Sequence, residues 1–243
     1  MTPMKVGMIQ SNYIPWRGYF DFIDDVDLFI FYDDVPYGMG KKWRNRNLIK
    51  TRYGPRWLTV PLKHGKDNKL ISEVAIDYSK NWQAEHINRL YENYHNAPFW
   101  NLYIDDFSTL INKDYTSISD LNVTLCKWIM GLLNIKTEVR MSHEFDGKGD
   151  KARRPLDLLI KVRAGAYLTG PNTEAYTDVR LFHSHRIRLE FKSYQYRSYR
   201  QSWGPFINEV SILDLLFNTG PEAGTHLKSL VPNRVAVDDR RGR

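Results

Sequence analysis

The first 34 residues carry the feature that most constrains the fold, a strand–loop–helix–strand pattern. Residues 5–10 are a short apolar run that ends in polar residues, which predicts a buried strand leading into a ligand loop. Residues 18–26 place apolar side chains at helical spacing, and residues 27–33 form a second apolar run. A right-handed crossover makes the two strands parallel, so the loop after each strand emerges at the carboxyl edge of the sheet, where open α/β sheets bind ligands.

Two further regions interrupt this pattern. Residues 36–54 turn basic and glycine-rich. Two alternating segments, 56–62 and 71–78, predict an antiparallel hairpin with its tip at residues 63–68, so the hairpin insertion spans about 36–78. Residues 80–134 carry aromatic and apolar side chains at helical spacing, which predicts two or three helices that pack as core.

The α/β alternation resumes after the helical region. Apolar runs predict three more strands and two more helices, and we expect the last residues of the chain, 238–243, to fray. The strands are expected at 137–145, 166–170 and 187–194, and the helices at 156–162 and 212–218. The whole pattern predicts an α/β fold in a single domain of residues 1–243, with a mostly parallel open sheet and flanking helices.

The composition limits the cellular compartment and the kinds of binding partner that we expect. The single cysteine, Cys126, excludes an internal disulfide and suits a reducing compartment. The N-terminus has no apolar signal core, and no run approaches the roughly 18 apolar residues of a membrane helix, so we expect a cytoplasmic protein without a membrane span. The net charge of +7 favours anionic partners, nucleic acid included, although a merely solvated basic surface is an equal alternative.

The loop after the first strand is the first candidate ligand site. Gly18 lets backbone approach a ligand, and the helix that follows offers unpaired N–H groups to an anion; a simple tight turn is the alternative interpretation. We expect Gln10, Asn12, Tyr13, Gly18 and Tyr19 to bind substrate or phosphate.

Three residues are candidate catalytic groups. Asp33 and Asp34 follow the second strand and could deprotonate an acceptor amine, bind a ribose or bind a divalent cation, or one of them could cap the next turn. His64 lies at the expected hairpin tip, where it is either a general base or merely exposed.

The basic segment contributes a second set of candidate binding residues. Trp43, Arg46 and Asn47 have the chemistry of a flap over phosphates, in which the guanidinium forms the charge contact and the indole stacks. A solvated loop is the alternative.

The third set lies near the end of the chain. Thr169, Gly170 and Asn172 follow the strand expected at 166–170 and are small, hydrogen-bonding residues suited to a second ligand loop at the same edge of the sheet. Tyr199 and Gln201 are expected to form part of a pocket wall, with ordinary sheet packing as the alternative.

Other motifs point to no known chemistry. His86 lies on an apolar helical face, which is typical of a core histidine, and His183 with His185 has no third ligand at metal spacing. We predict no metal site and identify no cofactor, and the chain has no nucleophile triad signature, P-loop or dinucleotide fingerprint.

Several ordered sequence blocks span nearly the whole chain. They are Gln10 with Tyr13, Pro15, Gly18 and Tyr19; Asp27 with residues 32–35; Trp43 with Arg46 and Asn47; residues 60–62; Trp82 with His86 and Tyr94; residues 167–170 with Tyr176; Tyr199 with Gln201; and Phe206 with residues 211–220. This set resembles the WbqC-like family, bacterial proteins encoded in O-antigen and other surface-polysaccharide gene clusters. The resemblance implies a role in polysaccharide biosynthesis.

A more distant likeness concerns the fold. The strand, the Pro-x-x-Gly-Tyr segment, the helix and the acidic end of the next strand resemble the nucleotidyltransferase and pantothenate-synthetase type of nucleotide-binding (HUP-like) fold. Those enzymes have a Gly-His pair where Gly18 and Tyr19 stand, so the likeness implies a nucleotide-binding architecture without the histidine that contacts phosphates.

These observations lead to one main functional hypothesis. We expect a transferase or ligase that modifies a nucleotide-linked or lipid-linked amino sugar, most simply by acyl or aminoacyl transfer from an activated acyl donor such as an acyl carrier. One alternative is a metal-dependent glycosyltransferase that uses Asp33 and Asp34, and another is a non-catalytic nucleotide- or RNA-binding module favoured by the net charge and the aromatic content.

Overall fold

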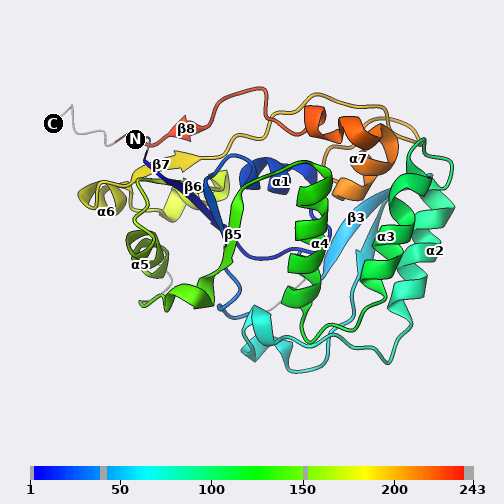
Figure 1. Cartoon of the computed structure of the whole chain (residues 1–243), viewed down its shortest axis with the longest axis horizontal. Coiled ribbons are helices and arrows are strands. Elements are labelled where there is room, and N and C mark those ends of the chain that lie inside the picture. Colours follow the sequence, from blue (N-terminus) through cyan, green and yellow to red (C-terminus); the bar gives the residue numbers. More distant parts are fainter. Residues whose placement is uncertain (1–2, 39–42, 150–152, 238–243) are drawn as a thin grey trace.

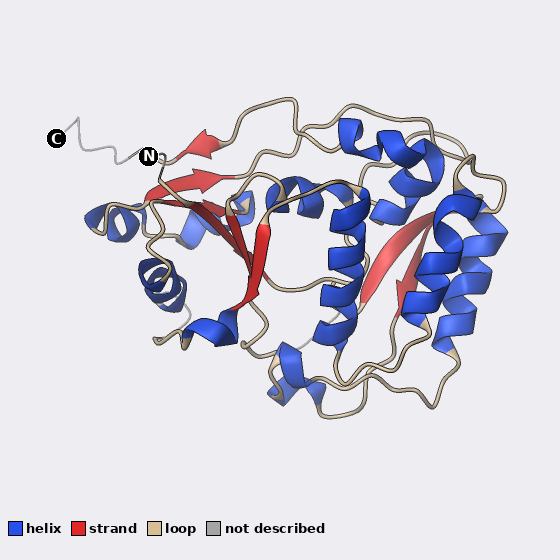
Figure 2. Ribbon diagram, viewed as in Figure 1, coloured by secondary structure: helices blue, strands red, loops and turns tan. Residues whose placement is uncertain are grey.

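The computed structural model describes residues 3–38, 43–149 and 153–237, and its central element is a six-stranded sheet (Figures 1 and 2). The strand order is β5-β2-β1-β6-β7-β8, and every neighbouring pair is parallel except β7 with β8. The strands are β1 (Lys5–Ile9), β2 (Leu28–Phe31), β5 (Glu138–Met141), β6 (Ala166–Thr169), β7 (Arg188–Phe191) and β8 (Arg234–Val235). The predicted mostly parallel α/β sheet is confirmed.

The strand order has one reversal point. Numbered along the chain, the five parallel strands run 3-2-1-4-5, which is the order of doubly wound nucleotide-binding folds. The order reverses between β1 and β6, which pair directly with Val6 opposite Tyr167. In open α/β sheets the ligand crevice lies at the carboxyl ends of the two strands that flank such a reversal.

Each face of the sheet is covered by a hydrophobic core. All four residues of β2 are buried, as expected for a parallel strand packed on both sides. Phe29 and Phe31 face the core that contains α1 (Arg17–Ile23), and Leu28 and Ile30 face the core of α5 (Arg154–Lys161). Helix α1 packs so closely on β1 that a Cβ atom at Gly7 would lie 2.5 Å from the ring of Phe22, so the close approach requires glycine there.

Four of the remaining helices extend the core of α1, whereas α6 packs in the core of α5. Figure 1 shows α2, α3, α4 and α7 gathered around the hairpin strand β3, to one side of the sheet. Residues 80–134 form three helices, in agreement with the prediction. The helix bounds are α2 (Trp82–Tyr94), α3 (Trp100–Ile111), α4 (Ile118–Leu132), α6 (Val179–Ser184) and α7 (Ile212–Thr219). Among the described residues, no helix has the length and apolar character needed to cross a membrane.

The hairpin insertion exists, and the strand predicted at 56–62 overlaps one of its strands, but the partner predicted at 71–78 was wrong. Strand β3 (Arg46–Thr51) pairs antiparallel with β4 (Gly54–Thr59), and Gly54 has a φ of 91° at the tight turn between them. Residues 71–78 instead begin with a short 3-10 helix and pair with the segment after β4 at the isolated bridge between Leu62 and Ile76. The strand β3 was not predicted because its sequence lacks an alternation of apolar and polar residues. A lysine is normally expected at an exposed position, but Lys50 is only 2% exposed.

Two strand ends also differ from the expectation. The strand expected at 137–145 stops at Met141 and continues as a 3-10 helix, and the strand expected at 187–194 stops at Phe191. The two-residue strand β8 was not predicted, and the tail at 238–243 lies outside the described residues.

Candidate functional site

A cleft of about 290 Å³ opens beside the reversal point of the sheet. Its walls come from the loop after β1, the segment after β6, the start of the hairpin and the segment before α7. They are formed by Asn12, Pro15, Trp16, Trp43, Asn47, Asn172 and Glu209. Four of these residues, Asn12, Trp43, Asn47 and Asn172, were predicted to bind substrate, and the structure brings them together.

The lining is aromatic and uncharged apart from one carboxylate. Two indoles and three carboxamides line it, and Trp43 leaves 47% of its surface exposed. None of the described lining residues is lysine or arginine. Indole faces and carboxamides suit a small polar ring with hydroxyl groups better than they suit a phosphate, which calls for cationic donors.

The loop that forms one wall has a strained backbone. Ile14 has a φ of 35°, a left-handed value that is costly for a β-branched side chain, by about 1–3 kcal/mol. Asn47 is buried, and its amide Nδ2 donates to the carbonyl oxygens of Tyr13 at 3.1 Å and of Ile14 at 3.0 Å. The N–H of Tyr13 donates to the carbonyl of Trp43 at 3.1 Å. The hairpin therefore holds the loop in its strained form.

Gly18 acts on the cleft through Trp16. A Cβ atom at Gly18 would lie 2.4 Å from the indole of Trp16, which packs in turn on the ring of Tyr194 at 5.2 Å. Glycine at this position therefore lets Trp16 fold over the start of α1. Gly18 itself is buried and is not among the residues that line the cleft.

The two tyrosines of the loop are buried and stabilise it through hydrogen bonds of their hydroxyl groups. Tyr13 and Tyr19 are buried, and the hydroxyl of Tyr19 donates to the carbonyl of Gln10 at 3.0 Å. Burial raises the pKa of Tyr13 well above its ordinary value, and its hydroxyl lies 2.9 Å from Nδ1 of His86. Because Nε2 of His86 lies 3.2 Å from the carbonyl of Thr59, Nε2 donates there and Nδ1 accepts from Tyr13.

This arrangement requires a neutral His86 and predicts a pH dependence. Burial lowers the pKa of His86 to about 4, whereas the unfolded chain takes up the proton near pH 6.5. Between these values the unfolded state binds one more proton, so the free energy of unfolding falls by about 1.4 kcal/mol per pH unit as pH drops. Urea titrations from pH 7 to pH 4 should show this slope removed in His86→Gln and retained in His64→Gln, which changes an exposed histidine; equal slopes in both variants would contradict it.

Asp33 is the centre of a buried network under the loop. It is 1% exposed, and its carboxylate accepts from the N–H of Ser11 at 2.8 Å and from the hydroxyl of Ser119. Burial raises the pKa of Asp33, although the two serines oppose the shift. The amide of Asn122 donates to Ser11 Oγ at 3.2 Å and to the carbonyl of Arg44 at 2.8 Å. Both oxygens of Asp33 are therefore occupied.

The residues that complete this network were missed by sequence reasoning. Arg44 donates to the side chain of Gln10, and Ser119 and Asn122 lie on the buried face of α4. The sequence does contain a signal for Ser119 and Asn122. Two polar side chains three residues apart on an otherwise apolar helical face indicate a buried hydrogen-bond partner. The Nε of Arg44 and the Oδ1 of Asn122 have no partner in the described structure.

Asp34 lies in a different environment from Asp33. It forms an ion pair with Arg154, which also donates to the carbonyl of Asp34 at 2.9 Å, and accepts from the hydroxyl of Ser142. The two neighbouring carboxylates thus contact separate groups. Within the described ranges, no group of three or more His, Cys, Asp and Glu side chains could hold a metal ion.

Four other predicted residues lie outside the lining of the cleft. His64 is exposed in the loop after β4, and the guanidinium of Arg46 stacks on Trp57 at 3.9 Å from the ring centre. Tyr199 and Gln201 instead donate to Oδ1 of the buried Asp214, each at 2.8 Å. This second polar network anchors the start of α7.

The segment after β6 reaches the cleft through Asn172. Thr169 is buried, and its hydroxyl lies 3.2 Å from the hydroxyl of Thr173. Gly170 has an ordinary φ of −73°, and a Cβ atom there would meet no other atom within 4 Å. The fold itself therefore does not require glycine at this position.

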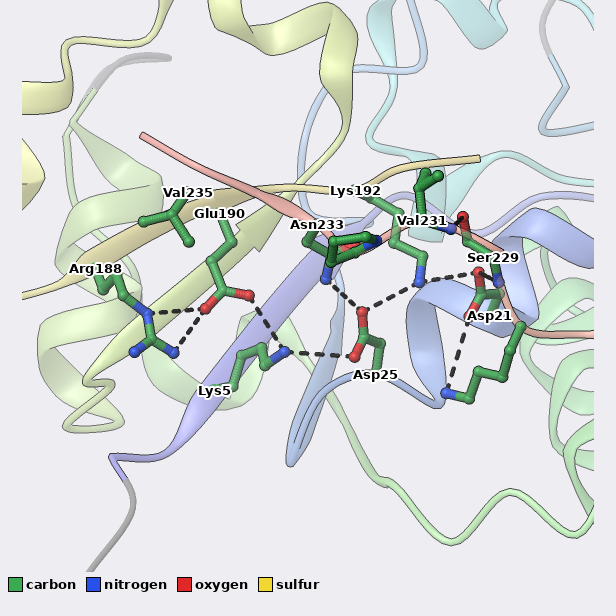
Figure 3. Close-up of a pocket in the computed structure, with 12 residues that line it drawn as sticks. Lys5, Asp21, Asp25, Arg188, Glu190, Lys192, Ser229, Val231, Asn233 and Val235 are labelled. Atoms are coloured by element: carbon green, nitrogen blue, oxygen red, sulfur yellow. Dashed lines mark hydrogen bonds and ion pairs between the residues drawn. The ribbon is translucent and has the colours of Figure 1, made fainter. Parts of the chain in front are cut away.

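A second hollow, of about 500 Å³, is lined by charged residues (Figure 3). Lys192 lies between Asp21 and Asp25, at 2.9 Å and 3.1 Å, and Lys5 lies between Asp25 and Glu190, at 3.4 Å and 3.2 Å. Burial alone would raise the pKa of Asp25, but hydrogen bonding and the charge of Lys192 hold it below its ordinary value. These charges satisfy one another and tie α1 to β7.

Comparison with known proteins agrees with the pattern of sequence blocks. A model of the WbqC-like protein family matches residues 10–226, a range that includes every residue lining the cleft. "Uncharacterized protein Rv1507c" of Mycobacterium tuberculosis (strain ATCC 25618 / H37Rv) is 40% identical over 227 residues, which cover 92% of this chain and 97% of that protein. No solved structure matches. The chain belongs to the WbqC-like protein family.

Proposed function

We propose that this protein is a transferase or ligase that modifies an amino sugar carried on a nucleotide or a lipid, by acyl or aminoacyl transfer in surface-polysaccharide synthesis. The observation that carries the proposal is the cleft at the reversal point, with indoles and carboxamides on its walls. A sugar ring presents an apolar C–H face that stacks on an indole and hydroxyl groups that bond to carboxamides.

The size of the cleft limits what it holds. Small-molecule pockets span roughly 300–1,000 Å³, so a cleft of about 290 Å³ suits one sugar ring, with the carrier outside it. The exposed ring of Trp43 and the partly buried ring of Trp16 are the stacking surfaces in this proposal.

The predicted catalytic residues take different parts in the proposal. For Asp33 or Asp34 to deprotonate an acceptor amine, one of their oxygens would have to exchange its present partner for the substrate. The geometry favours a positioning role for Asp33, because it holds the backbone at Ser11, next to Asn12 of the cleft.

A binding assay with matched tryptophan variants tests the proposal. UDP-, dTDP- and GDP-linked amino sugars are titrated by saturation-transfer NMR against the wild type, Trp43→Ala and Trp203→Ala. Trp203 is 41% exposed, close to the exposure of Trp43, but lies elsewhere, with its indole N–H bonded to the carbonyl of Asn93. We expect Trp43→Ala to weaken binding about tenfold, from a loss of about 1.4 kcal/mol, and Trp203→Ala to leave it unchanged.

Turnover completes this test. The sugar that binds is incubated with acyl thioester and acyl adenylate donors, and the acylated amine is detected by mass spectrometry. If none of the amino sugars bound, or if both tryptophan variants bound as the wild type does, the proposed function would be wrong.

Gly170 offers a further prediction about the edge of the sheet beside the cleft, because it precedes Asn172 in the chain without lining the cleft itself. Because its surroundings are open, Gly170→Ala should fold with a free energy of unfolding within about 1 kcal/mol of the wild type. At the carboxyl end of β6 the added methyl group would meet a ligand that approaches the backbone, so binding should fall at least several-fold. Gly131→Ala, in an equally open position on α4, is the matched control and should leave binding unchanged; an equal affinity in both variants would refute the contact.

A further inference from the structure

Glu209 lies on a firmly held part of the cleft wall. Just beyond it, the N–H of Ser211 donates to the carbonyl of Leu48 at 2.7 Å, and the N–H of Ile212 donates to the carbonyl of Pro15 at 2.9 Å. Ser211 also forms a bridge with Trp16. These backbone bonds tie the segment that carries Glu209 to both the hairpin and the loop after β1, so its side chain belongs to the same cleft as the indoles.

The carboxylate of Glu209 is free to meet a ligand. Within the described structure it forms no hydrogen bond or ion pair, whereas Asp33 and Asp34 both have internal partners. It is the one acidic group among the described lining residues, and none of those residues is a lysine or an arginine that could neutralise it. A free negative charge facing a small cleft favours a ligand with a positive charge and disfavours an anionic one.

The other lining residues narrow down which positively charged ligand would pair with Glu209. Asn12 and Asn172 offer neutral donors and acceptors, which suit hydroxyl groups, whereas the carboxamide of Asn47 already bonds to backbone groups. An indole face attracts a nearby cation as well as a sugar ring. A carboxylate accepts hydrogen bonds from hydroxyl groups too, but an ammonium on a ring that otherwise carries hydroxyls would also neutralise its charge. We infer that Glu209 determines specificity by pairing with the amino group of the sugar, so that the cleft selects an amino sugar over the corresponding hydroxyl sugar. This inference rests on the proposed function and deepens it.

The experiment compares two sugars that differ only in this group. The methyl glycosides of glucosamine and glucose are titrated by saturation-transfer NMR at a pH where the amine is protonated and the carboxylate ionised. The wild type, Glu209→Gln and Glu222→Gln are compared, because Glu222 is an equally exposed glutamate outside the cleft. We expect the wild type and Glu222→Gln to bind the amino sugar about fivefold more tightly, as one partly solvated ion pair allows.

Glu209→Gln should bind the two sugars equally, with the affinity for the glucose derivative unchanged. That last result separates loss of charge recognition from loss of structure, and the thermal midpoint of each variant provides a second check on folding. Equal binding of both sugars by the wild type would overturn the role of Glu209 and leave the sugar cleft intact. Failure of both sugars to bind would overturn the proposed function and this inference with it.

Discussion

Replacing Lys192 with methionine is expected to lower the free energy of unfolding by about 3–5 kcal/mol, the largest effect of any single change considered for this protein. The side chain of Lys192 is 3% exposed, and its ammonium contacts Asp25 and the fully buried Asp21. Removing the cation leaves buried carboxylate charge without its main partner, and methionine fills the space of the aliphatic stem. Urea denaturation followed by circular dichroism measures the change.

The neighbouring Lys228 provides a control for this prediction. Its side chain is 53% exposed and pairs with Asp24 at 2.6 Å, so Lys228→Met should cost less than about 1 kcal/mol. Adding Asp21→Asn to Lys192→Met should recover part of the loss, because it removes the uncompensated charge. If the two lysine variants were equally stable, the buried ion pairs would not be a main source of stability.

Replacing Asp33 with alanine is expected to cost about 2–3 kcal/mol of stability and to weaken ligand binding. The reason is that the N–H of Ser11 and the hydroxyl of Ser119 lose their acceptor inside the protein, and the loop that carries Asn12 loses its anchor. Denaturation and the sugar titrations measure the two effects on the same samples.

Asp33→Asn then separates positioning from catalysis. Asparagine retains an oxygen for the N–H of Ser11, and its amide can donate to the hydroxyl of Ser119, so a positioning residue should tolerate the change with most of its stability and turnover. A general base would lose turnover completely while binding stayed the same. The second outcome would restore Asp33 to the catalytic role that the sequence suggests.

The position of the cleft follows from local sequence patterns. Apolar runs of strand length, separated by a helical period, predict parallel strands, and the loops after such strands meet at one edge of the sheet. Asn12 and Asn172 lie far apart in the chain but follow two such strands, and the structure brings them into one cleft.

Contacts between residues far apart in the sequence determine the features of the site that local patterns did not predict. Glu209 lies at the cleft because the segment before α7 forms hydrogen bonds to the backbone of Leu48 and Pro15. The neighbouring residues contain no sequence pattern that predicts this long-range contact. Tyr199 and Gln201 have the chemistry of a pocket wall, yet a buried carboxylate, Asp214, takes up their hydrogen bonds. The strand β3 was missed for a related reason, since tertiary partners such as Gln201 allow Lys50 to be buried.

The ion pairs of the charged hollow also affect the order of folding steps during synthesis. Asp25 is reached by Lys192 from 167 positions away and by Asn233 from 208 positions away. On the ribosome, Asp21 and Asp25 therefore emerge long before Lys192 and Asn233, and of the groups that pair with the carboxylate of Asp25 only Lys5 precedes it in the described chain. Closure of this face needs the segment around Asn233, so we expect it to be a late step of folding, and contacts of such high sequence separation make it a slow one.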